Sequence, residues 1–145
     1  MKLKLGLAVA ALAVAATGIA VANENIIGLR QQVMKTNGAA AKLAVGMLKG
    51  ETPFDASVAA AAMTQIADDL SVFATYFPEG TETGDTKAGN KIWSDPDGFN
   101  TAAKTAEDAA KAAATAAADG PEAFGAAFGA VGKACGGCHE VYRES

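Results

Sequence analysis

Side chains that commonly build active sites are scarce in this chain of 145 residues, which holds one His, two Cys and one Trp. Acidic residues outnumber basic ones by 16 to 12, and no basic cluster occurs, which argues against nucleic acid as a partner. The acidic pairs Asp68-Asp69 and Glu107-Asp108 have no His neighbours with which to form an acid–base site, and we do not predict an enzyme. No useful length of sequence alternates between polar and apolar residues, and strands are therefore not expected.

Bulky side chains are also few. Aromatic residues make up 6% of the chain, although half of all residues are apolar and Ala supplies much of that half. An alanine-rich chain forms helices readily but provides little side-chain volume to fill a core. We therefore expect the interior to be filled in part by something other than side chains.

The first residues have the features of an export signal. Lys2 and Lys4 precede a long uncharged run, which ends in the small-x-small pattern of Ala20–Ala22. This pattern predicts a cleaved signal peptide over residues 1–22 and a mature domain over 23–145 in the periplasm. The alternative is an uncleaved membrane anchor, but the run is short for a spanning helix and is interrupted by Gly and Thr. We expect the mature protein not to be embedded in a membrane.

The mature part shows helical periodicity throughout. Apolar residues recur at steps of three and four and predict helices over about 25–49, 53–77, 96–117 and 121–142. Thr52 is the expected cap of the second helix and Asp95 precedes the third. The segment 78–91 is rich in Gly and Thr and is predicted to be a plain surface loop. Two short connections and one long one favour an all-α fold, an antiparallel four-helix bundle.

Both cysteines and the only histidine lie together in Cys135-Gly136-Gly137-Cys138-His139. C-x-x-C-H in an exported chain is the attachment signature of c-type haem. On a helix these positions share one face, so two thiols can bond one porphyrin edge while the imidazole reaches the iron. A disulfide would give the histidine no role, and zinc would need a further ligand. The motif predicts one covalently bound haem c near the C-terminus.

The segments CGGCHEVYRES at 135–145, RQQVMKTNG at 30–38, GETPFD at 50–55 and KIWSD at 91–95 resemble the class II cytochromes c, the family that includes cytochrome c prime. The resemblance covers the whole mature chain. It implies a non-enzymatic haem protein that carries electrons between redox partner proteins, or one that binds NO or CO at a five-coordinate iron. It also implies a possible homodimer through the first two helices.

Individual positions match those of the family. The resemblance makes Cys135 and Cys138 the thioether attachment points and His139 the proximal iron ligand. Arg143 corresponds to a basic residue near the proximal imidazole, and Arg30 to an arginine beside a haem propionate. A charge on the apolar stripe of the first helix needs a partner in any case, and the alternative for Arg30 is that its side chain extends to solvent.

Met34 falls where the family places its distal residue. At 1.5 Å per residue it lies about 14 Å from the start of the first helix, and His139 lies roughly 8 Å from the end of the last, so the two are at similar levels of the bundle. Met47 and Met63 lie farther from this end. A Met on an apolar stripe also serves simply as packing. We predict that Met34 ligates the iron in a low-spin electron carrier, with a five-coordinate, gas-binding protein as the alternative.

Overall fold

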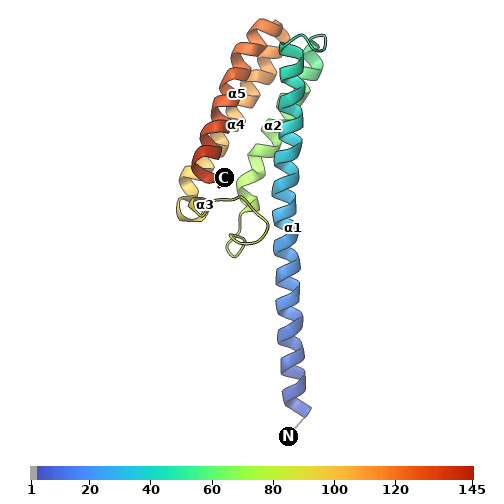
Figure 1. Ribbon diagram of the computed structural model, residues 1–145, viewed down its shortest axis with the longest axis vertical. Helices are drawn as coiled ribbons and strands as arrows, with labels where there is room; N and C mark the ends of the chain where they lie inside the picture. Colours follow the sequence, from blue (N-terminus) through green and yellow to red (C-terminus); the bar gives the residue numbers. More distant parts are fainter. Residues whose placement is uncertain (1–2) are drawn as a thin grey trace.

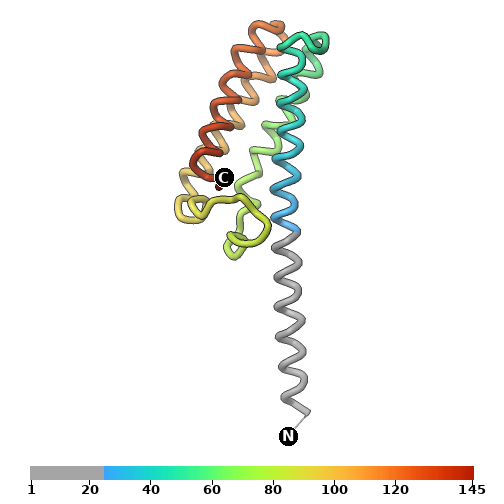
Figure 2. The backbone as a smooth tube through the Cα atoms, viewed as in Figure 1, coloured from blue at the N-terminus to red at the C-terminus, as the bar shows by residue number. Residues whose placement is uncertain are grey.

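A computed structural model describes residues 25–145 with their side chains. The predicted signal peptide, residues 1–22, lies outside these residues. Of helix α1 (Leu3–Leu48), the part from residue 25 onward belongs to the bundle (Figure 2). In the described part of the chain, no helix combines the length and the apolar character needed to cross a membrane.

The fold is an antiparallel four-helix bundle, as predicted. Helix α1 is followed by α2 (Ala56–Phe73), α4 (Pro96–Ala116) and α5 (Pro121–Tyr142), which run alongside one another (Figure 1). The short helices η1 (Ala74–Tyr76), α3 (Lys91–Ser94) and η2 (Ala117–Asp119) lie between them. The α1–α2 and α4–α5 connections lie at one end of the bundle, and α3 and the long loop close the other end, near the C-terminus (Figure 1).

Aspartates cap the starts of α2 and α4. Asp95 caps α4 by accepting a hydrogen bond from the Gly98 N–H at 3.2 Å. The predicted cap at Thr52 is wrong. The Thr52 N–H donates to the Gly46 carbonyl in the turn after α1, and Asp55 caps α2 instead by accepting from the Val58 N–H at 3.0 Å.

Alanine dominates one half of the core. Between α1, α2, α4 and α5, most of the fully buried side chains are methyl groups, which let the helix backbones approach closely, while Met63 and Phe124 supply the larger volumes. A second, aromatic cluster lies at the end with the long loop and consists of Val33, Phe73, Ile92, Phe99 and Tyr142. The candidate site lies where the two halves meet.

Candidate cofactor site

A cavity of about 580 Å³ opens between α1 and α5. Helices α2 and α4 form its base, and residues 85–88 of the long loop cross one end. Its lining is mostly apolar. Pockets of roughly 300–1,000 Å³ with this character bury cofactor-sized ligands. The space that the alanine-rich composition predicted is therefore present, and it is gathered in one place.

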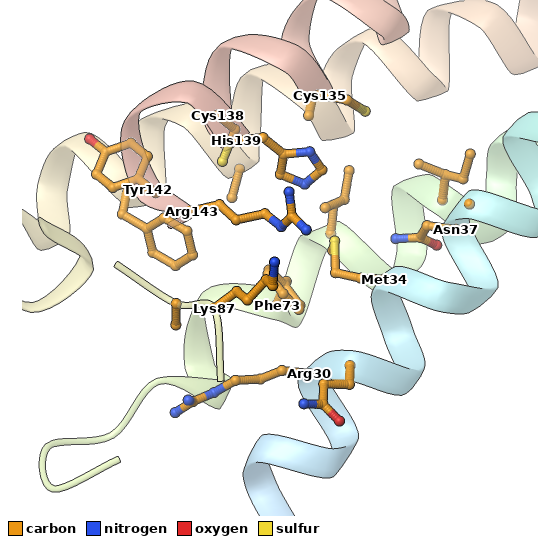
Figure 3. A pocket seen from close by; sticks show the side chains of 18 of the residues that line it. Arg30, Met34, Asn37, Phe73, Lys87, Cys135, Cys138, His139, Tyr142 and Arg143 are labelled. Carbon is orange, nitrogen blue, oxygen red and sulfur yellow. The ribbon is translucent and has the colours of Figure 1, made fainter. Parts of the chain in front are cut away.

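One wall of this cavity carries the motif residues. Cys135, Cys138 and His139 all project from α5 toward it, since positions i, i+3 and i+4 share a helix face (Figure 3). Both cysteines are free thiols and half-buried. Among the residues that the structure describes, no three His, Cys, Asp or Glu side chains come together to hold a metal ion. The arrangement matches a group that bonds both sulfurs and the imidazole.

The surroundings favour the uncharged forms of these three groups. Burial raises the pKa of the Cys135 thiol, and burial together with the neighbouring Cys135 raises that of Cys138. The pKa of His139, at the cavity rim, is lowered by burial and, to a smaller extent, by the charge of Arg143. A lowered pKa keeps the imidazole neutral at neutral pH, and only the neutral ring offers a lone pair to a metal.

Met34 lies across the cavity from His139. Its thioether projects from α1 with the sulfur toward the imidazole side (Figure 3). The structure thus brings together the two residues that the sequence placed at similar levels. Met47 and Met63 are buried in the core, with 5% and 0% of their surfaces exposed, and are not part of the cavity lining.

Arg30 is bound to the long loop. The residue is 4% exposed. Its Nε donates a hydrogen bond to the Tyr76 carbonyl at 2.6 Å. Its Nη1 donates to the Thr81 carbonyl at 3.0 Å, and its Nη2 donates to the Thr81 hydroxyl. The guanidinium also lies over the Phe77 ring, 4.2 Å from its centroid. Burial lowers its pKa, although an arginine remains charged. This charge therefore has partners within the chain, and its side chain does not extend to solvent.

The segment 78–91 is consequently not the plain surface loop that its composition predicted. Thr81 is only 1% exposed, since Arg30 holds it from α1. Farther along, the Gly89 N–H donates to the Tyr142 carbonyl and the Glu144 N–H to the Lys87 carbonyl, both at 2.9 Å. The loop is thereby fixed to α1 and to the end of α5, and it forms part of the cavity wall.

Two cations line the cavity near this loop. Lys87 and Arg143 reach toward its interior (Figure 3), and within the described residues neither has a carboxylate partner. The resemblance identified Arg143, but sequence reasoning missed Lys87, because the loop has no periodicity from which its direction could be read. The two positive charges provide a site for carboxylates such as the propionates of a haem.

Sequence reasoning also missed Asn37 as a site residue. It lines the cavity one helical turn beyond Met34, is 9% exposed, and neither its amide nitrogen nor its oxygen has a hydrogen-bond partner. Its position on the apolar stripe of the first helix was the signal, since a polar side chain there needs a partner.

This arrangement was compared with known proteins. A sequence model of the family described as Cytochrome C' matches residues 25–143. The chain belongs to the cytochrome c' family. Cytochrome c' from Rhodopseudomonas palustris is 40% identical over 101 residues, which are 69% of this chain and 68% of that protein. Cytochrome c-556 from Agrobacterium tumefaciens is 37% identical over 114 residues, or 79% of this chain and 93% of the relative.

Solved structures of cytochromes c' share the fold. One is a variant of the protein from Alcaligenes xylosoxidans, determined as its nitric oxide complex; it is 28% identical, with a TM-score of 0.76 over 85% of this chain and 97% of that one. Cytochromes c' are non-enzymatic haem proteins, and the family implies a covalent haem c. The residues present fit that group, since the cavity offers two thiols, an imidazole, unpaired cations and an apolar lining.

Proposed function

We propose that this member of the cytochrome c' family carries single electrons between redox partner proteins. The observation that carries the proposal is the placement of Met34 opposite His139 across one apolar cavity. A Met/His axial pair is the ligand set of electron-transfer cytochromes and raises the reduction potential. Met34 would thus place this chain in the low-spin branch of its family.

Each motif residue has a defined part in this proposal. Cys135 and Cys138 would hold the haem through thioether bonds, and His139 would supply an imidazole ligand to its iron. When bound, the haem supplies a reversible one-electron couple at its iron. The attachment residues lie beside Gly136 and Gly137, which are exposed, so a partner protein can approach the bound edge from outside α5.

The cations at the loop end would hold the propionates. Arg30 has five N–H donors, of which one binds the Tyr76 carbonyl of η1 and two bind Thr81 of the loop; the resemblance implies that the remaining donors would serve a propionate. Lys87 supplies a second positive charge from the loop. Arg143 stands on the proximal side, where its charge helps to keep His139 neutral.

Two measurements on protein from its natural host test this proposal. Mass spectrometry is expected to give the mass of residues 23–145 plus one haem, and the mass of the bare polypeptide would overturn the attachment. Optical and electron paramagnetic resonance spectra of the oxidised protein are expected to be low spin, with a Met–iron charge-transfer band. A high-spin spectrum without that band would overturn ligation by Met34.

The second candidate is a five-coordinate cytochrome c' that binds NO or CO, with Met34 only covering the distal side. The specific observation in its favour is the similarity to the Alcaligenes xylosoxidans protein, which was solved with nitric oxide bound. Rapid CO binding by the reduced wild-type protein would favour this candidate over the first.

We also propose that the protein works in the periplasm as the mature domain 23–145, released from the signal peptide over 1–22. A second copy of the chain is the proposed occupant of the shallow groove between α1 and α2, where Leu43 and Val58 are 44% and 41% exposed. The family resemblance indicates this pairing of the first two helices, and sedimentation of the haem-loaded protein measures it.

A further inference from the structure

Asn37 is a buried amide to which no part has yet been assigned. It lies on α1 with 9% of its surface exposed, and both polar atoms of its side chain are cut off from solvent. Within the described structure neither atom has a hydrogen-bond partner. The residue lines the cavity beside Met34 (Figure 3).

A buried amide without a partner lowers the stability of a protein, because it has lost its hydrogen bonds to water without replacing them. The other amide that lines this cavity shows the usual solution, since Gln31 donates from Nε2 to the Asp85 carbonyl at 2.6 Å. Asn37 makes no hydrogen bond of this kind within the described residues. Met34 is its neighbour along the cavity wall (Figure 3).

Met34 offers an acceptor on the same helix face. Residues three apart on a helix lie on one face, with roughly 5–6 Å between their Cβ atoms. A thioether sulfur is a weak acceptor with two lone pairs, so one can point to an iron while the other accepts a hydrogen bond. The two side chains share no hydrogen bond in the structure, so a bond between them would require a change of side-chain rotamer.

We propose that Asn37 is a positioning residue for the sixth iron ligand: its amide N–H donates a hydrogen bond to the thioether sulfur of Met34 and holds it in the ligating rotamer. This inference rests on the proposed ligation by Met34 and adds a residue to it. It also explains why a polar side chain occupies a buried position on an otherwise apolar stripe.

The test compares Asn37→Leu and Asn37→Ala with the control Gln32→Leu in haem-loaded protein. Both Asn37 variants remove the donor, but only the first preserves the side-chain volume. The control removes an exposed amide from the same helix, one that does not line the cavity and that has its own partner in Thr36. The measurements are the intensity of the Met–iron charge-transfer band in the oxidised form and the CO affinity of the reduced form.

CO must displace Met34, so weaker Met34 ligation raises the apparent CO affinity. Loss of one hydrogen bond of about 1.4 kcal/mol corresponds to a tenfold change. We expect both Asn37 variants to bind CO about tenfold more tightly and to lose part of the charge-transfer band, with the control close to wild type.

The outcomes separate this inference from the proposed function. A low-spin wild type with Asn37 variants that match Gln32→Leu would overturn the role of Asn37 and leave ligation by Met34 intact. A high-spin wild type would overturn both. An effect in Asn37→Ala that is absent from Asn37→Leu would trace the change to lost volume, and the hydrogen bond would then be refuted.

Discussion

Replacing Arg30 by Met would remove its contacts with the long loop and leave the hydrogen bond from Gln31 to the Asp85 carbonyl as the remaining bond between α1 and the loop that the structure shows. The variant keeps an apolar stem over the Phe77 ring but removes three hydrogen bonds from a charged donor. Thr81, which is 1% exposed, would then have a carbonyl without its partner. Each acceptor left unpaired costs about 1–3 kcal/mol, whereas removing a buried charge returns part of its desolvation cost. The net loss of stability should be about 2–4 kcal/mol.

Denaturant unfolding of the haem-loaded protein measures this loss, and hydrogen exchange of residues 79–89 shows where it arises. Lys35→Met is the matched control, because it removes the same charge from the exposed face of the same helix. It should change the free energy of unfolding by less than about 0.5 kcal/mol. Equal stabilities of the two variants, with loop amides as protected as in wild type, would refute the reasoning that Arg30 fixes the loop.

Three further predictions concern the ligand, a helix cap and assembly. Met34→Ala should convert a low-spin oxidised protein into a high-spin one that binds CO readily, as followed by paramagnetic resonance and CO titration. The hydrogen bond from the Gly98 N–H is the main cause of the lowered pKa of Asp95. The charged cap therefore stabilises the protein above the ordinary pKa of an Asp, and this contribution is lost as the pH falls through the lowered value. Asp95→Ala should lower the temperature midpoint of unfolding at pH 7, and the difference from wild type should vanish in acid. Leu43→Glu should shift the protein toward monomer in sedimentation without altering its visible spectrum.

The fold was predictable from the sequence because each long helix carries its own stripe of apolar residues. Each of the three connections between these helices also contains Gly or Pro. The start of α2 was not predictable, since Thr52 and Asp55 are both good caps and only the turn that closes on Gly46 decides between them. The local sequence alone cannot show that Thr52 belongs to the turn after α1, which leaves Asp55 to cap α2.

The candidate site divides in the same way. The α5 face was predictable, because Cys135 and His139 belong to a local motif whose spacing fixes their common direction. The loop wall was not, because Lys87 lies in a segment without regular structure and its position depends on bonds to α1 and to the end of α5. Asn37 was visible in the pattern as a polar interruption, but its lack of a partner emerged only from the packed structure.

The alanines of α4 have a consequence for how a redox centre would behave in this cavity. Ala103 and Ala106 form part of its base, and a methyl group has no rotamers to exchange. A surface of this kind cannot rearrange its side chains when the charge beside it changes. The adjustment that accompanies gain or loss of an electron would therefore fall on α1 and the loop, which leaves a small reorganisation energy on the α4 side.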